Sequence, residues 1–435
     1  MSEVVVVGGG LAGCWAAATG AASGARVTLV RRALGATATS AGPLDFVPPA
    51  EAADPAGCLA RLPRSDPGHP YLAGGTAPSL EELEGEAERL GLALAAAGLP
   101  VRVSLRQPLL LGGVTGQVRL AGMAPETQAA GDLGRATGRS VVVVGVAGLA
   151  RFDPAAVASA LDERRLGWPA PLRAIALQVS PDLPGLAHDV AVDLDDATLA
   201  RALEAPGGAE ALGVAIAAAL RPGSADLALL PAVLGIEDPE SVARRVAEAA
   251  GMLVAELLTS PPSAPGWRLQ RACDRLTIDA GVRLVRGTAA GVRVEEGRAL
   301  SVTLDSGETL PCDALVLATG KYLGGGVVAD PRPREPLLDL PLFSGGVPVV
   351  RLALRDLVER ARFRDQPFAS LGVHTDATGT PLDEHGRPVC ANVTVCGDLL
   401  AGMDPTLSGG GLGVAAWTAT RAARTALRQV GAAAA

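Results

Sequence analysis

The sequence reads VVVVGGGLAG from Val4 to Gly13, four β-branched residues followed at once by glycines. An apolar run of this kind predicts a strand that is buried on both faces. The glycines have the spacing GxGxxG, and the alanine-rich segment that follows predicts a helix. The first glycine permits a tight turn, the second lets a phosphate approach the backbone, and the third lets helix and strand pack closely. The stretch therefore predicts a nucleotide phosphate site built from Gly8, Gly10, Leu11, Ala12 and Gly13.

The end of the second predicted strand departs from the usual dinucleotide pattern. A strand over 26–30 closes a βαβ unit, and such a strand usually ends in an acid that binds the adenosine ribose. Here the chain continues with Arg31 and Arg32. Three interpretations stay open: Arg31 binds a phosphate, the adenosine half is bound in another way, or the cofactor is a mononucleotide without adenosine. Two solvated arginines are the simpler alternative.

Composition excludes several classes of function. With 435 residues, of which 49% are apolar and 19% charged, the chain can bury more than one core. A net charge of −8 argues against nucleic-acid binding, which needs a basic face. No apolar run reaches the roughly 20 residues that cross a bilayer, and the N-terminus shows no signal core. We expect a cytoplasmic protein that meets a membrane only through a partner.

The six cysteines carry no recognisable metal or disulfide pattern. They are scattered along the chain, without a CxxC motif or a Cys/His pair at zinc spacing. A disulfide framework is not expected in a large chain of this kind, and no run has iron–sulfur cluster spacing. We therefore expect no metal and treat each cysteine as a small buried residue.

The order of predicted elements divides the chain into three parts. Residues 35–75 are rich in glycine and proline and predict loops. Strands and helices alternate between 104 and 262, which predicts an inserted α/β domain. The flanking segments, 1–103 and 263–435, are the first and second parts of one nucleotide-binding domain.

Two later segments favour a flavin over a nicotinamide. A strand that ends in Ala318-Thr319-Gly320 brings backbone close to a dinucleotide, and another strand ends in Gly397-Asp398. In two-dinucleotide-fold flavoproteins the acid at this place holds a ribityl hydroxyl, and the following glycine-led helix directs its positive end at the flavin pyrimidine. An ordinary helix-capping role is the alternative for Asp398. The predicted fold is therefore α/β, a two-dinucleotide-binding flavoprotein fold with an inserted α/β domain. Further predicted flavin contacts are Thr39, Ser40, Gly42, Gly409, Gly410, Gly411 and Leu412.

These segments, in this order, resemble the B-subunit family of anaerobic glycerol-3-phosphate dehydrogenase. The resemblance covers nearly the whole chain, through VVVVGGGLAG (4–13), TSAGPLDF (39–46), LALLPAVLGIED (227–238), ALVLATGKYLGGGVVAD (314–330) and LGVHTD (371–376). It implies a flavoprotein in a membrane-associated enzyme that oxidises sn-glycerol 3-phosphate to dihydroxyacetone phosphate and passes electrons toward quinone. The implied partners are a catalytic, FAD-containing A subunit and an iron–sulfur C subunit, which would hold this chain at the inner face of the cell membrane. The implied cofactor is FMN, whereas the GxGxxG pattern itself is equally typical of FAD.

A more distant resemblance, to fumarate reductase and succinate dehydrogenase flavoproteins, supplies catalytic candidates. In that group an arginine delivers a proton and histidines bind a dicarboxylate, which here suggests Arg334 and His374. A proline-rich surface loop and a structural histidine are their alternatives. Lys321 follows the ATG turn and faces either the cofactor or solvent, and His69 is a candidate by resemblance alone. The segment 144–148 resembles a second phosphate turn but lacks the full spacing, so a tight strand–helix turn is favoured.

Three functions stay open on this basis. The first is an electron-transferring flavin subunit that works in a glycerol-3-phosphate dehydrogenase complex. The second is a stand-alone flavin oxidoreductase that acts on a small carboxylate or ketone, for which Arg334 would be needed. The third is a scaffold with a degenerate nucleotide site, against which the intact glycines and Asp398 speak.

Overall fold

The computed structural model describes residues 3–135, 140–163, 172–186, 194–261, 263–361, 364, 366–404 and 409–433. Its contacts divide the chain into two compact units, which are described separately. The first unit comprises Met1–Thr37, Leu44–Ala97 and Gln270–Ala435. The second comprises Ala38–Pro43 and Gly98–Leu269.

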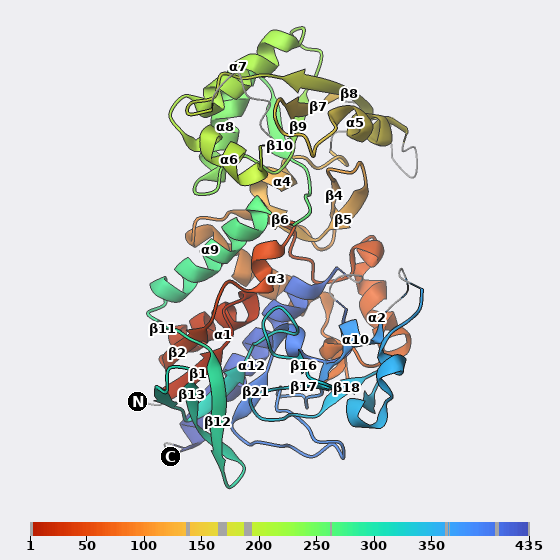
Figure 1. The fold of residues 1–435 in the computed structure, drawn as a ribbon. Helices are drawn as coiled ribbons and strands as arrows, with labels where there is room; N and C mark the ends of the chain where they lie inside the picture. The colour runs from red at the N-terminus through yellow and green to blue at the C-terminus, as the bar shows by residue number, and fades with distance from the viewer. Residues whose placement is uncertain are drawn as a thin grey trace. The chain divides into compact units, whose positions relative to one another are not determined.

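The first unit is built on a parallel five-stranded sheet (Figure 1). Val4–Val7 are buried and form the centre of this sheet, as the apolar run predicts. Neighbouring strands run parallel on both sides. In spatial order the strands are β11 (Arg283–Arg286), β2 (Arg26–Arg31), β1 (Glu3–Val7), β15 (Ala314–Leu317) and β21 (Val393–Val395).

Alternate residues of this sheet pack against different layers. Val5 and Val7 share a buried core with Val302 and Leu304 of an antiparallel sheet. That sheet consists of β12 (Ala289–Glu295), β13 (Arg298–Leu304) and β14 (Thr309–Pro311). The helices α1 (Leu11–Ala22) and α12 (Gly411–Ala433) contact the same parallel strands as a second layer. Helix α9 (Ala264–Asp279) is linked to β2 by the ion pair between Asp274 and Arg31.

Glu86 links three helices of the first unit. Its Oε1 accepts the Trp15 indole N–H at 2.7 Å and the Thr420 hydroxyl at 2.7 Å. Arg89 adds an ion pair at 2.6 Å. This buried carboxylate on α3 (Leu80–Ala96) is thus fully paired and fixes α1 and α12 beside α3.

The region predicted as loops contains a helix, α2 (Pro55–Ser65). Asp54 caps it by accepting the Gly57 N–H, and Cys58, Leu59 and Leu62 form its buried face. Pro63 lies inside the helix, which explains why the glycine and proline content of the region hid it.

The remaining short elements of the first unit are β16 (Val328–Ala329), β17 (Pro333–Arg334), β18 (Leu342–Ser344), β19 (Val347–Pro348), β20 (Gly372–Val373), α10 (Pro367–Ser370) and the 3₁₀ turns η2 (Pro49–Glu51), η3 (Pro70–Leu72), η4 (Val349–Arg351), η5 (Leu354–Leu357) and η6 (Gly397–Leu399).

The second unit has a parallel sheet of its own. Four strands lie in the order β10 (Leu253–Glu256), β9 (Leu227–Leu230), β7 (Ser140–Val146) and β8 (Arg173–Val179). Its helices are α4 (Glu126–Ala129), α5 (Pro154–Glu163), α6 (Asp196–Glu204), α7 (Gly208–Ala219) and α8 (Pro239–Ala250), and two hairpin-like pairs join β3 (Val101–Val103) to β6 (Met123–Pro125) and β4 (Leu109–Gly112) to β5 (Val118–Ala121). The contacts separate the two units after Ala97 and after Leu269. The domain boundaries expected from the sequence, after residues 103 and 262, stay predictions.

Within the described ranges, no helix is both long and apolar enough to cross a membrane.

A buried ion pair stabilises the second unit. The side chains of Arg268 and Glu256 are 2% and 0% exposed, with 2.6 Å between Nη1 and Oε2. Arg268 also donates to the Gly235 carbonyl, and Glu256 accepts from the Thr127 hydroxyl and the Leu234 N–H. Both charged groups are therefore paired and hydrogen-bonded out of contact with water.

We expect Glu256→Gln to lower the free energy of unfolding by about 3–5 kcal/mol, because it leaves the Arg268 charge buried without its counter-ion. Chemical unfolding followed by circular dichroism measures the change. The matched control is Glu248→Gln, which removes an exposed ion pair with Arg244 and should change the free energy by less than about 0.5 kcal/mol. Equal effects of the two substitutions would contradict a stabilising role for the buried pair.

Candidate functional site

The glycine turn after β1 has a geometry that only glycine allows. Gly8 has φ 127°, and its N–H donates to the Val30 carbonyl at 2.9 Å. A Cβ on Gly8 would lie 2.1 Å from the Ala318 carbonyl oxygen, and one on Gly13 would lie 1.8 Å from the Gly8 carbonyl oxygen. The tight turn and the close helix–strand approach predicted for these residues are therefore present.

The turn leads into the N-terminus of α1. Gly10 is the N-cap residue, and the Leu11 N–H donates to the Thr37 hydroxyl at 2.8 Å. A Cβ on Gly35 would lie 2.5 Å from the Gly10 Cα, so Gly35 packs directly on the turn. Sequence reasoning missed Thr37 and Gly35, although a glycine two residues before a threonine in the loop after the second strand was a visible signal. The helix end offers backbone N–H groups and a partial positive charge to an anion.

Arg31 packs against this turn and pairs with α9. A Cβ added to Gly9 would lie 2.8 Å from the Arg31 Cβ, and the Arg31 guanidinium forms an ion pair with Asp274. The hydrogen bond to Asp274 raises the pKa of Arg31, against the effect of burial. Gln270 Nε2 donates to the Gly9 carbonyl at 2.8 Å and to Asp274 at 3.1 Å. Arg31 thus has a carboxylate partner from another element, which no local pattern around it indicated.

Arg32 is exposed. Its Nη1 lies 3.9 Å from the position of a Cβ on Gly325, in the loop that follows β15. Arg32 therefore stands at the same edge of the sheet as the glycine turn, where a phosphate or solvent can contact it.

The carboxyl ends of β15 and β21 bring the later motifs together. Thr319 and Gly320 follow β15, and Gly320 has φ 66°. The Thr319 hydroxyl is buried and has no hydrogen-bond partner among the described residues. Lys321 Nζ donates to Asp398 Oδ1 at 3.1 Å and to the Met403 carbonyl at 2.8 Å. Lys321 is buried, so its alternative assignment to the surface is wrong.

Burial raises the pKa of Asp398, and the charge of Lys321 and hydrogen bonds from it act in the opposite direction. The side chain is 34% exposed. Asp398 therefore offers a carboxylate that is neutralised from one side and open on another, which suits a ligand that donates hydroxyl hydrogen bonds.

The motif that ends in Asp398 lies against the first turn of α1. Gly397 has φ 72°, and a Cβ on it would lie 2.7 Å from the Ala12 Cβ. Its N–H donates to the Thr418 hydroxyl of α12 at 3.0 Å. The segments 8–13 and 397–398, far apart in the sequence, are thus neighbours across the sheet edge.

The glycines that open α12 pack on the segment 45–49. A Cβ on Gly409 would lie 2.8 Å from Pro49 Cδ, and the Gly413 N–H donates to the Asp45 carbonyl at 3.0 Å. Gly410, Gly411 and Leu412 lie between them, with Gly411 the first residue of α12. Ser408, which begins the motif in the sequence, lies outside the described residues.

The predicted loop contacts Thr39, Ser40 and Gly42 belong to the second unit. Thr39 ends the 3₁₀ turn η1 (Ala36–Thr39). The Ser40 carbonyl accepts the Ser263 hydroxyl at 2.6 Å, and a Cβ on Gly42 would lie 1.9 Å from Gln128 Oε1. Their role toward a cofactor stays a prediction.

The two catalytic candidates lie at different short strands. Arg334 is exposed on β17, and His374, directly after β20, stacks on Phe343 with 3.9 Å between ring centroids and 3° between planes. Burial lowers the pKa of His374. Across the described ranges, no hydrogen bond or ion pair joins Arg334 to His374. Their catalytic role stays a prediction.

Other residues singled out in the sequence have structural partners. His69 Nδ1 accepts the Tyr71 N–H at 3.2 Å, and burial lowers the His69 pKa to about 4. In the segment 144–148, a Cβ added to Gly145 would lie 2.8 Å from Pro154 at the start of α5, which is typical of the tight strand–helix turn that the sequence favoured. All six cysteines are buried, as predicted. In the described part of the chain no group of His, Cys, Asp and Glu is arranged to bind a metal.

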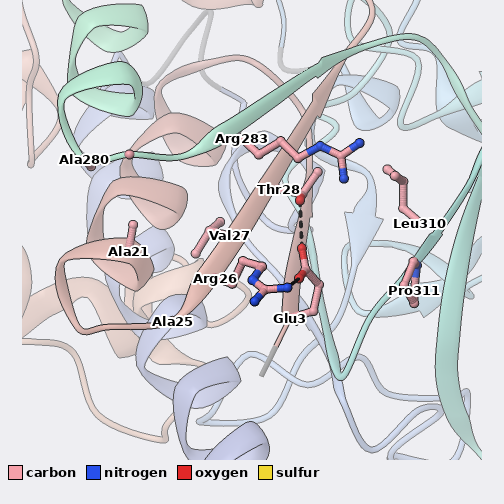
Figure 2. A pocket seen from close by; sticks show the side chains of 11 residues that line it. Glu3, Ala21, Ala25, Arg26, Val27, Thr28, Ala280, Arg283, Leu310 and Pro311 are labelled. Carbon is pink, nitrogen blue, oxygen red and sulfur yellow. Dashed lines mark hydrogen bonds and ion pairs between the residues drawn. The ribbon is translucent and has the colours of Figure 1, made fainter. Parts of the chain in front are cut away.

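A surface pocket of the first unit lies at the other edge of the parallel sheet. Figure 2 shows its lining by Glu3, Arg26 and Arg283, which stand at the amino ends of β1, β2 and β11. Glu3 accepts the Thr28 hydroxyl at 2.9 Å and lies 3.7 Å from Arg26. Because ligands of open α/β sheets bind outside the carboxyl ends of the strands, this pocket is not the candidate site.

The geometry around α1 fits a flavin nucleotide. The carboxyl edge combines a glycine cradle at a helix N-terminus, the unpaired buried hydroxyl of Thr319 and the partly open carboxylate of Asp398. A flavin nucleotide has groups of the matching chemistry: a phosphate for the helix N-terminus, and hydroxyl groups and polar ring edges for the hydroxyl and the carboxylate.

We expect Gly13→Ala to abolish flavin binding, because its methyl group would overlap the Gly8 carbonyl and displace α1 from the turn. The absorbance of the flavin that remains after gel filtration measures the loss. The control is Gly85→Ala on an exposed part of α3, where a Cβ meets nothing within 4 Å; it should keep the flavin and raise stability by about 1 kcal/mol. Flavin retained by Gly13→Ala would contradict the assignment.

Named relatives are similar to this chain over nearly its whole length. The B subunit of anaerobic glycerol-3-phosphate dehydrogenase from Yersinia enterocolitica is 29% identical over 427 residues, 95% of each chain. A probable B subunit of anaerobic glycerol-3-phosphate dehydrogenase from Halobacterium salinarum is 28% identical over 99% of this chain and 98% of its own. Among solved structures, 3-ketosteroid delta1-dehydrogenase from Sterolibacterium denitrificans aligns with a TM-score of 0.43 and 11% identity, over 99% of this chain and 100% of its own.

The family model described as FAD binding domain matches residues 3–414. This match takes in the glycine turn, the ATG turn and Gly397-Asp398, as well as the second unit. The chain therefore belongs to the FAD binding domain family.

Proposed function

We propose that this flavin-dependent oxidoreductase is the flavin-carrying B subunit of an anaerobic glycerol-3-phosphate dehydrogenase complex. The complex would oxidise sn-glycerol 3-phosphate to dihydroxyacetone phosphate and deliver the electrons to quinone. The observation that carries the proposal is the similarity to B-subunit chains over 95% or more of both lengths. That similarity takes in both units of the chain.

In this proposal the carboxyl edge of the first sheet holds the flavin. Backbone N–H groups at the start of α1, between Gly10 and Ala12, bind phosphate in the place that the Thr37 hydroxyl now partly fills. Asp398 accepts hydrogen bonds from ribityl hydroxyls, and the N-terminus of α12 faces the flavin pyrimidine with Gly409, Gly410, Gly411 and Leu412. The bound flavin supplies the electron-transfer chemistry.

The size of the nucleotide decides what Arg31 does. With FAD, the Arg31–Asp274 pair lies where the adenosine ribose is usually bound, and either member can contact it. With FMN, Arg31 and Arg32 would stand near the phosphate at the end of the nucleotide. Extraction of the cofactor and its identification by mass distinguish the two.

The partners in this proposal are a catalytic, FAD-containing A subunit and an iron–sulfur C subunit. Electrons from glycerol 3-phosphate reach the flavin of this chain and leave it toward the clusters of the C subunit. The C subunit also holds the complex at the inner face of the cell membrane.

The test is co-expression of this chain with the A and C subunits of the same complex. We expect the chain to co-purify with both, and dye-linked oxidation of sn-glycerol 3-phosphate to require it. Gly13→Ala should abolish that activity because it removes the flavin, whereas Gly85→Ala should keep it. An A–C complex with full quinone-linked activity in the absence of this chain would overturn the proposal.

The same preparations separate the two other functions. Turnover of a small carboxylate or ketone by the chain alone, lost in Arg334→Ala, would identify a stand-alone oxidoreductase. A chain that joins the complex but binds no flavin at stoichiometric amounts would be a scaffold.

A further inference from the structure

Lys321 is unusual in both composition and environment. Of the 38 lysines and arginines in the chain, it is the only lysine. It is 4% exposed, directly after the ATG turn at the end of β15. A chain that uses arginine at every other basic position keeps lysine at this one. The reason should therefore lie in the contacts that the ammonium group makes.

Those contacts fit a compact ammonium. Nζ lies 3.1 Å from Asp398 Oδ1 and 2.8 Å from the Met403 carbonyl oxygen. An ammonium is a small point charge with three rotatable donors, whereas a guanidinium is a wide planar fork. In a site that is almost closed to solvent, the larger group would have to displace the segment that carries Met403.

The ion pair is asymmetric in exposure. The Lys321 side chain is 4% exposed and the Asp398 side chain 34% exposed. The ammonium therefore supports the carboxylate from behind, while the carboxylate keeps an open side at the carboxyl edge of the sheet. Gly397, beside it, contacts the first turn of α1, so this open side belongs to the same edge as the glycine turn.

Lys321 is the group that opposes protonation of Asp398. Burial and the charge of Asp404 raise the pKa of Asp398, whereas Lys321 lowers it through its charge and its hydrogen bonds. Tyr322 also faces this carboxylate, and its own pKa is raised to about 12, chiefly by burial, so it stays neutral. Without the ammonium, Asp398 would hold its proton to higher pH.

We propose that Lys321 is a positioning residue for the flavin: it fixes Asp398 in one orientation and keeps it charged, so that the carboxylate can accept the ribityl hydroxyls. The inference rests on the proposed placement of the flavin at Asp398. It assigns a role to a side chain that acts through another residue and need not touch the cofactor itself.

The first experiment is a titration of flavin-free protein with flavin, followed by fluorescence quenching, between about pH 5 and pH 9. Lys321→Met should bind flavin about ten- to a hundredfold more weakly at neutral pH, the range expected for the loss of a charge-assisted hydrogen bond. Affinity should fall with decreasing pH in both proteins, because protonated Asp398 is the weaker acceptor. The fall should begin at higher pH in Lys321→Met, because the pKa of Asp398 is then raised further.

Two further variants make the result specific. Arg283→Met removes a charge at the amino edge of the same sheet, where it pairs with Glu308, and should leave affinity and its pH dependence unchanged. In an Asp398→Asn background, Lys321→Met should have little additional effect, because the two residues act as one unit. Additive losses in the double variant would overturn the proposal, as would a Lys321→Met protein with the affinity and pH profile of the parent.

A second measurement needs no substitution. Protein grown with ¹⁵N-labelled lysine has a single side-chain ammonium resonance, because Lys321 is the only lysine. We expect flavin to shift this resonance at stoichiometric amounts, and a resonance that flavin leaves unchanged counts against the proposal. Parent protein that binds no flavin at all would instead refute the proposed function, so the two failures are distinguishable.

Discussion

The contact between Gly13 and the Gly8 carbonyl is the constraint on which the first unit depends. A methyl group on Gly13 would lie 1.8 Å from the Gly8 carbonyl oxygen, far inside van der Waals contact. This approach presses α1 onto β1 and directs its N-terminus to the carboxyl edge of the sheet. Gly397 repeats the arrangement from the other side, because its Cα lies against Ala12. Three glycines from the two ends of the chain thus bring a helix N-terminus and a carboxylate to one edge, and the chemistry of a flavin site follows from that proximity.

Local patterns predicted the elements that carry this edge. Val4–Val7 form a strand because four β-branched side chains in a row fit only a sheet that is buried on both faces. A strand was also predicted before the ATG turn, where β15 lies, and the glycine spacing predicted the first turn. Sequence reasoning missed α2, where Pro63 and the glycine-rich surroundings concealed a helix that Asp54 caps. The fold class and the flavin were therefore predictable, since both depend on residues close together in the sequence.

Contacts between distant residues could not be predicted. Nothing near Lys321 in the sequence indicates that it pairs with Asp398, and nothing near Arg31 indicates Asp274. Thr37 was missed because a single hydroxyl in a loop has no periodicity that would mark it. Arg334, on β17, and His374, directly after β20, were grouped by resemblance alone, and their catalytic role stays a prediction. Pairings across a sheet edge depend on topology, which one sequence does not display.

The order in which the first sheet is assembled along the chain has a consequence for biosynthesis. β15, the partner of β1, is made some three hundred residues after β1, and α12, which packs along α1, is made later still. Domains fold as units during translation, and long-range strand pairing is slow. The second unit has its own sheet and can form before β15 is available to pair with β1. The flavin site at the carboxyl edge is then complete only once α12 has been made, because both α1 and α12 contribute their N-termini to it.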